Sequence, residues 1–161
     1  MNLRCLFVAL CCLVGITACT SPTTELSPTD VQTIEAEVEA AFQRLVADAR
    51  SLEPEPYLAH LAQEGFTAQL DGTVLSSYEA FSEMYRTQIP SIEAFLSLEF
   101  DNVAVSVLNR TTAVLVNEFT ETIVLASGDT LALAGGGSQV WTRANADWKL
   151  IHISGSTRAQ E

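Results

Sequence analysis

Apolar residues recur at steps of three and four over the first half of the chain, which is the spacing of one face of an α-helix. A first helix is predicted to start at Pro28, because Ser27 and Asp30 are placed as a capping box around it. Its apolar face consists of Val31, Ile34, Val38, Ala41, Phe42, Leu45, Ala49 and Leu52. One side of this helix is therefore expected to be buried.

Two shorter helices and a hairpin are predicted next. Pro54 and Pro56 end the first helix and start a short second one, which Gly65 closes. Strands 66–70 and 73–75 flank Asp71-Gly72, a dipeptide that accepts the positive φ angles of a two-residue turn. A third helix follows the capping box at residues 76–79 and stops at Pro90, with Phe81, Met84, Tyr85 and Ile89 as its apolar stripe.

From Leu96 onward the pattern changes to long runs of Val, Thr, Leu and Phe, which are typical of β-strands. Polar turns at residues 108–110, 127–129 and 144–147 divide the runs into four antiparallel strands in a meander. Helices followed by strands in this order predict an α+β fold, with three helices packed on the concave face of a curved antiparallel sheet. Such helices and sheet can enclose a cone-shaped cavity.

The first 19 residues form a separate segment. Arg4 precedes the apolar and small-residue run from Leu6 to Ala18, which is too short for a bilayer that needs roughly 20 helical residues and is typical of a signal peptide. The run ends in Ile16-Thr17-Ala18-Cys19, which resembles the bacterial lipobox and predicts lipidation at Cys19. An ordinary secretory signal cut near Ala18 is the alternative.

This segment sets the expected organisation of the chain: a signal peptide at 1–18, a lipidated tether at 19–28, one domain at 29–157 and a tail at 158–161. A lipidated Cys19 would anchor the protein to a membrane of the cell envelope. Thr20, in place of Asp, indicates the outer membrane facing the periplasm, if the organism has one. Only one of the 4 cysteines would remain, so no disulfide framework is expected.

Composition narrows the function classes. The 161 residues, 48% of them apolar, suit one globular domain. A net charge of -12, from 8 Lys plus Arg against 20 Asp plus Glu, argues against nucleic-acid binding, because phosphate recognition needs a basic face.

The end of the chain carries a family resemblance. Val140-Trp141-Thr142-Arg143, a polar turn, Trp148-Lys149-Leu150-Ile151-His152 and Ser156 resemble the last two strands of SnoaL-like domains, in the nuclear transport factor 2-like (ketosteroid isomerase-like) superfamily. Two positions depart from the pattern: Ser154 replaces a frequent second histidine, and the turn before Trp148 lacks a glycine. The resemblance implies the cone-shaped fold but leaves function open, since this scaffold carries isomerases, dehydratases, ligand carriers and dimerisation modules.

The resemblance also implies which side chains approach the cavity, namely Tyr57, Phe66, Tyr85, Trp141 and His152. Glu118, His152 and Tyr85 are the candidate catalytic residues, because a carboxylate, an imidazole and a phenol suit proton transfer of the ketosteroid-isomerase type. Strand alternation places His152 on the face of Trp148 and Leu150. Structural roles are open too: a hydrogen-bonded, half-buried His152 and a solvent-facing Glu118.

No cofactor or metal site is predicted. His60 and His152 are far apart in the sequence, and Gly135-Gly136-Gly137 lacks the Lys-Ser/Thr of a phosphate loop. We interpret the glycines as a place where the sheet bends or bulges, and where the missing side chains leave room for a ligand or a neighbouring backbone. Three functions stay open: binding of a small, mostly apolar ligand, an envelope interaction or assembly module, and an isomerase or dehydratase.

A homodimer through the outer face of the sheet is also expected. Both alternating sets of the strand 111–125 are largely apolar, with Val114, Val116 and Val124 on one side and Leu115, Phe119, Ile123 and Leu125 on the other. Ile151 and Ile153 repeat the pattern in the last strand. A sheet covered by helices on one face only should have a polar second face, so the surplus apolar surface is expected to meet a second copy.

Overall fold

The first helix begins where its capping box predicts, whereas the third is capped by Ser77, one residue later than the predicted box at 76–79, and the second has no side-chain cap. The computed structural model describes residues 25–159. Helix α1 (Pro28–Arg50) starts with the Ser27 hydroxyl accepting a 3.1 Å hydrogen bond from the Asp30 backbone nitrogen, while the Asp30 carboxylate accepts one of 3.1 Å from the Ser27 nitrogen. The helix ends before Leu52, which has a φ of 58° that is incompatible with helix continuation.

The remaining elements follow the predicted order. They are α2 (Pro54–Leu58), β1 (Thr67–Leu70), β2 (Thr73–Leu75), α3 (Tyr78–Gln88), the 3-10 turn η1 (Ile89–Ser91), β3 (Ile92–Asn109), β4 (Thr112–Leu125), β5 (Thr130–Ala144) and β6 (Asp147–Ala159). Strand β3 starts at Ile92, ahead of the predicted Leu96. The predicted signal peptide, Cys19 and the tether as far as residue 24 lie outside the described residues. Within 25–159, no helix has the length and apolar character that a membrane crossing requires.

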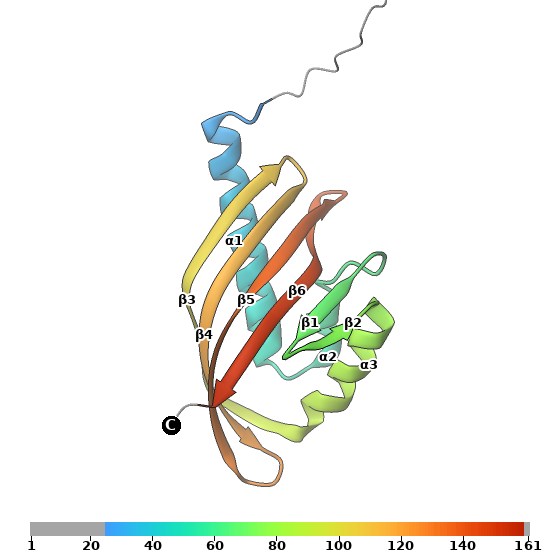
Figure 1. Cartoon of the computed structure of the whole chain (residues 1–161), viewed down its shortest axis with the longest axis vertical. Helices are drawn as coiled ribbons and strands as arrows, with labels where there is room; N and C mark the ends of the chain where they lie inside the picture. The colour runs from blue at the N-terminus through green and yellow to red at the C-terminus, as the bar shows by residue number, and fades with distance from the viewer. Residues whose placement is uncertain (1–24, 160–161) are drawn as a thin grey trace, which may run out of the picture.

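The six strands form one sheet in the order β2-β1-β6-β5-β4-β3 (Figure 1). Strands β3 to β6 are the predicted antiparallel meander. Strand β1 joins its edge by pairing in parallel with β6, Ala68 opposite Ile153, so the sheet is mixed and not purely antiparallel. The β1–β2 hairpin thereby adds two strands to the β6 edge and widens the sheet.

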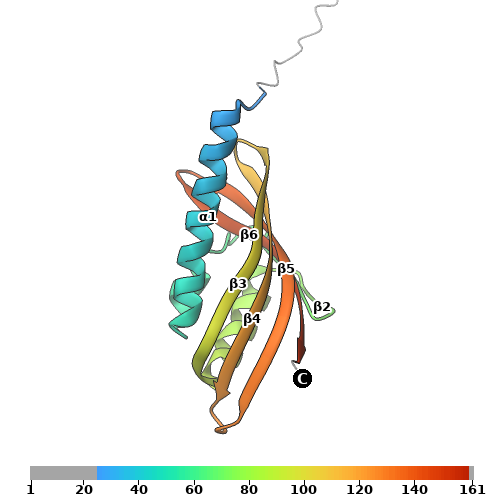
Figure 2. The ribbon, with the colours of Figure 1, turned by 90° about the vertical axis from the view of Figure 1, so that its left-hand side faces the viewer.

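Helices cover only one face of this sheet. Figure 2 shows α1 running along that face, while the opposite face carries no helix. The core lies between α1 and the sheet, where its largest fully buried side chains are Trp141, Phe42, Phe66, Leu58, Leu115 and Leu150. The predicted α+β architecture is confirmed.

A β-bulge in β6 decides which residues face the helices. Trp141 pairs with Leu150 and Val140 pairs with His152, so Ile151 is an extra residue in β6. Beyond the bulge Ile153, and not His152, shares the covered face with Leu150 and packs against the core. The predicted grouping of His152 with Trp148 and Leu150 is therefore wrong, and so is the shared face of Ile151 and Ile153.

Candidate functional site

A cavity of about 320 Å³ lies between the helices and the covered face of the sheet, where the sequence predicts a cone. Helix α1, strand β3 and strand β4 supply most of its apolar wall: Phe42, Leu45, Val46, Ala49, Phe95, Leu98, Phe100 and Phe119. Its volume falls within the range of small-molecule sites, about 300–1,000 Å³. The cavity is the candidate functional site.

Two stacked tyrosines form the helical side of the cavity. Tyr57 of α2 and Tyr85 of α3 have ring centroids 4.4 Å apart and planes 13° apart, and Phe81 lies 5.9 Å from Tyr85. Burial raises the pKa of Tyr57 to about 12. The pKa of Tyr85 is raised more than that of Tyr57. Burial is the larger cause, and the nearby Tyr57 is the smaller one. Both phenols therefore stay protonated at neutral pH and are available as hydrogen-bond donors.

Two carboxamides lie on the sheet side. Asn117 of β4 and Gln139 of β5 are 8% and 5% exposed and line the cavity. Strand alternation turns them inward, because Asn117 is two residues from the buried Leu115 and Gln139 is two residues from the buried Trp141. These amides are the most deeply buried polar side chains that the sheet contributes to the wall.

Two carboxylates lie towards the more exposed end. Glu121 shares the inward face of β4, and burial raises the pKa of its carboxyl. Asp71, in the β1–β2 turn, accepts hydrogen bonds from the Thr157 backbone nitrogen at 2.7 Å and from the Thr157 hydroxyl at 3.0 Å. No Lys, Arg or His is among the described residues that line the cavity.

The structure brings together two of the five predicted pocket residues. Tyr57 and Tyr85 line the cavity, whereas Phe66 and Trp141 are 1% and 0% exposed within the core. His152 lies beyond the bulge with its Nδ1 atom 2.8 Å from the Thr67 hydroxyl. The prediction of one shared cavity is wrong for these three residues, because two fill the core and the bulge turns the third away.

The three candidate catalytic residues do not converge. Tyr85 is in the cavity, but Glu118 is exposed and accepts a 2.7 Å hydrogen bond from the Asn102 amide on the uncovered side of the sheet. His152 is absent from the cavity wall as well. A proton-transfer site built from this trio is therefore ruled out by the geometry.

Sequence reasoning missed Asn117, Glu121 and Gln139. The signal was available for the first two, because they occupy the same alternating set as Leu115, Phe119 and Ile123. Gln139 could have been found from its spacing of two from Trp141. Polar residues inside an apolar alternating set indicate a polar contact within the enclosed space.

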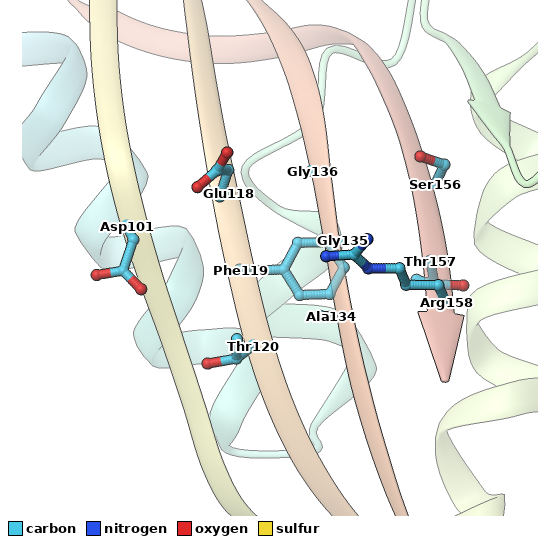
Figure 3. Close-up of a pocket in the computed structure, with 10 residues that line it drawn as sticks. All are labelled: Asp101, Glu118, Phe119, Thr120, Ala134, Gly135, Gly136, Ser156, Thr157 and Arg158. Carbon is cyan, nitrogen blue, oxygen red and sulfur yellow. The ribbon is translucent and has the colours of Figure 1, made fainter. Parts of the chain in front are cut away.

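The glycine run has a structural cause. A Cβ on Gly135 would lie 2.2 Å from the Ser156 carbonyl oxygen and 2.7 Å from the Phe119 ring, which Figure 3 shows reaching from β4 to β5. A Cβ on Gly137 would lie 2.6 Å from the Ser154 carbonyl oxygen. The interpretation that these glycines admit a neighbouring backbone is confirmed, but a bulge at this place is wrong, because β5 pairs with β4 and β6 across the three glycines without a shift in register.

Above the glycines, the uncovered face has a hollow of about 420 Å³ (Figure 3). Asp101, Glu118 and Arg158 border it, and most of its floor is strand backbone. Within residues 25–159, no group of three or more His, Cys, Asp or Glu side chains is arranged to hold a metal ion. The hollow therefore offers strand backbone with charged side chains at its border, and no apolar wall like that of the cavity.

The SnoaL-like domain family matches residues 38–160 of the chain. A protein named for scytalone dehydratase from Novosphingobium aromaticivorans has a similar structure, with a TM-score of 0.71 and 13% identity over 83% of this chain and 89% of that chain. A nuclear transport factor 2-like superfamily protein from Salmonella enterica gives a TM-score of 0.70 and 20% identity over 80% and 94% of the two chains.

A third similar structure, from Xanthomonas campestris, is named for the association domain of calcium/calmodulin-dependent protein kinase II. It gives a TM-score of 0.64 and 17% identity over 76% of this chain and 86% of that chain. No curated protein matches the sequence significantly. These TM-scores show that the chain shares its fold with the three structures.

Proposed function

The chain belongs to the SnoaL-like domain family, and we propose that it is an envelope lipoprotein whose domain binds a small, mostly apolar ligand in the cavity between its helices and sheet. The observation that carries the proposal is the largely aromatic and aliphatic wall around about 320 Å³, in which carboxylate, amide and hydroxyl groups are the minority. That composition is typical of sites that bury an apolar ligand and orient it by a few hydrogen bonds.

Acid-base catalysis of the isomerase or dehydratase kind is the second candidate function. One observation favours it, the raised pKa of the Glu121 carboxyl inside the cavity. However, burial alone raises that pKa, and Glu121 is not among the groups that raise the pKa of Tyr57 or Tyr85. Without an acid facing a phenol, ligand binding accounts for the cavity better than catalysis does.

Filling the cavity tests the binding function. We expect the neutral fluorescent probe N-phenyl-1-naphthylamine to bind the wild-type protein, with fluorescence enhancement as the readout. Ala49→Phe should weaken binding at least about 10-fold, because a phenyl ring from α1 would occupy space that the probe needs. Ala47→Phe, on the exposed side of the same helix, is the matched control. Equal binding by both variants would contradict the proposal.

The membrane anchor rests on the lipobox-like residues 16–19. We expect the protein purified from its native host to carry acyl chains on Cys19, because residues 16–19 resemble a lipobox at the end of an apolar run. Two or more acyl chains would hold the protein on a membrane, whereas a single chain gives only marginal binding. Intact-mass measurement of the wild type and of Cys19→Ala checks this. An unmodified mass for the wild type would rule the anchor out.

We also propose that two copies associate through the uncovered face of the sheet. Val116 on that face is 44% exposed, and Val114 and Val124 belong to the same alternating set of β4. Their cross-strand partners are small or weakly polar, namely Ser106, Ala104, Val140 and Ser138, while the charged Glu118 and Asp101 lie at one end of the patch. Such a surface is suited to a two-fold contact between identical sheets.

A further inference from the structure

At the buried end of the cavity, two carboxamides interrupt an apolar wall. Asn117 and Gln139 come from neighbouring strands, and Gly137, the direct partner of Asn117, leaves the space between them free of a side chain. Both amides are more than nine-tenths buried and stand next to the core residues Leu115 and Trp141. Buried amides are costly unless they are hydrogen-bonded, so their presence here needs an explanation.

Trp141 determines which end of Gln139 is available. The indole Nε1 atom can only donate, so the amide atom 3.0 Å from it is the carbonyl oxygen Oε1. The NH₂ group of Gln139 therefore remains, and among the described residues no acceptor is found for it. Its nitrogen is not one of the fully buried atoms that lack a partner, so this donor stays accessible beside the cavity, in an orientation that Trp141 fixes.

Asn117 has little internal compensation either. Its Nδ2 atom donates to the Glu118 carbonyl oxygen at 3.5 Å, which is at the weak limit for a hydrogen bond. The two amides therefore offer hydrogen-bonding capacity that the protein itself leaves largely unused. A bound molecule can use that capacity without displacing any strong internal contact.

Charge restricts what this molecule can be. The acidic groups Asp71 and Glu121 lie towards the other end of the cavity, and Glu121 is four residues from Asn117, or about 13 Å along a strand. No cationic side chain is present in the described wall to neutralise an anion. A carboxylate or phosphate ligand would be repelled, whereas an uncharged acceptor would not.

We propose that the ligand is an uncharged molecule with a carbonyl oxygen at its buried end, which accepts hydrogen bonds from the amide groups of Gln139 and Asn117. Its apolar body lies along Phe100 and Phe119, whose ring centroids are 6.1 Å apart. This assignment rests on the proposed ligand-binding function and adds to it the chemical class of the ligand and its direction in the cavity.

A matched pair of probes tests the carbonyl preference. 2-Acetylnaphthalene carries a ketone, whereas 2-ethylnaphthalene has nearly the same shape and no acceptor. Competition against N-phenyl-1-naphthylamine should show that the wild-type protein binds the ketone about 3- to 10-fold more tightly, the gain of one or two ordinary hydrogen bonds. 2-Naphthoate, the anionic probe, should bind more weakly than either. Equal affinity for ketone and hydrocarbon would overturn this inference and leave the proposed function intact.

Variants assign the preference to the amides. Gln139→Met should reduce the affinity ratio of ketone to hydrocarbon towards 1, while Gln69→Met, on the uncovered side of the sheet where Gln69 accepts a hydrogen bond from Ser154, should retain it. If circular dichroism shows that Gln139→Met is unfolded, Asn117→Leu provides the second measurement. A ratio unchanged in the folded variants contradicts the inference. If no probe binds the wild type, the proposed function fails and this inference fails with it.

Discussion

Two glutamates on β4 show how strand alternation places one side chain in solvent and another in the interior. Glu118 is exposed and bonded to Asn102, whereas Glu121, three residues later, belongs to the opposite alternating set and lines the cavity. Burial disfavours the charged form of a carboxyl group, so it raises the pKa of Glu121. The charge of Glu121 therefore opposes folding, and the charge of Glu118 is carried in water.

The pH dependence of stability should report this difference. A carboxyl whose folded pKa is raised above 4.5 costs stability as the pH rises through that range, because the folded state then has to accommodate the buried charge. Glu121→Gln should accordingly increase the free energy of unfolding at pH 7, by less than about 1 kcal/mol because the group is partly solvated. Urea denaturation at pH 7 and at a pH well below 4.5 measures it.

The gain should disappear at the lower pH, where Glu121 is protonated in both states. Glu118→Gln provides the same substitution at a solvated carboxylate and should lack the gain at pH 7. A gain for Glu121→Gln that persists in acid would mean that the charge is not its cause.

The polar cavity residues of β4 could have been predicted from the sequence by applying strand alternation to every residue of the strand, and not only to its apolar residues. Glu118 is an acid between Val116 and Thr120 in an otherwise apolar strand, which suggests a site residue, yet the alternating set of Leu115, Phe119 and Ile123 places Asn117 and Glu121 inside. Trp141 and Phe66 were expected in the cavity because their elements enclose it, but large side chains also fill the core beneath it. Tertiary packing decides between those two places.

At the scale of elements, helix starts were predictable because their signals are local. Ser27 and Ser77 cap α1 and α3 with their own hydroxyl groups, which accept hydrogen bonds from the Asp30 and Ala80 backbone nitrogens. The bulge at Ile151 was not predictable, since it arises from the pairing of β5 with β6 and has no proline or glycine to mark it. One extra residue was enough to reverse the face assigned to His152.

The cap of α1 gives a second prediction. Hydrogen bonds from Arg110 above all, and then from Ser27, lower the pKa of Asp30 from 3.8 to about 2. A depressed carboxyl pKa stabilises the fold above the unfolded-state value, and that contribution is lost as the pH falls from 3.8 towards 2. Asp30→Asn should lower the melting temperature at pH 7 and have a much smaller effect near pH 2, where Asp30 is itself becoming neutral.

Thermal unfolding monitored by circular dichroism at both pH values measures this effect. Asp101→Asn, which removes an exposed carboxylate that makes no cap, is the control and should leave the melting temperature at pH 7 nearly unchanged. A decrease in melting temperature for Asp30→Asn that is as large near pH 2 as at pH 7 would show that the asparagine disturbs the helix start by something other than lost charge.

In the whole molecule, helices cover one face of the sheet, and the other face is the surface that we propose for dimer formation. Figure 1 views the sheet from the side that carries no helix, and Figure 2 shows α1 on the other side. The class of fold was predictable, because the order of helical and strand patterns leaves few ways to bury both. The extent of the apolar outer surface was not, because the bulge carries Ile153 into the core and so removes it from that surface.

The remaining outer surface still predicts a homodimer, now centred on β4. Val116→Asp places a charge on a side chain that is already 44% exposed, so it should leave the fold intact while introducing facing carboxylates across a two-fold contact. Sedimentation of the protein lacking residues 1–19, at tens of micromolar, should give a dimer for the wild type and a monomer for Val116→Asp. Val74→Asp, at a 71% exposed position on the β1–β2 hairpin, is the matched control and should remain dimeric.

A wild-type monomer would contradict the proposal, and a dimer that survives Val116→Asp would mean that the contact lies elsewhere. A dimer broken only by Val116→Asp would place the contact on the uncovered sheet, opposite to the cavity, so that ligand entry would stay open in the assembly.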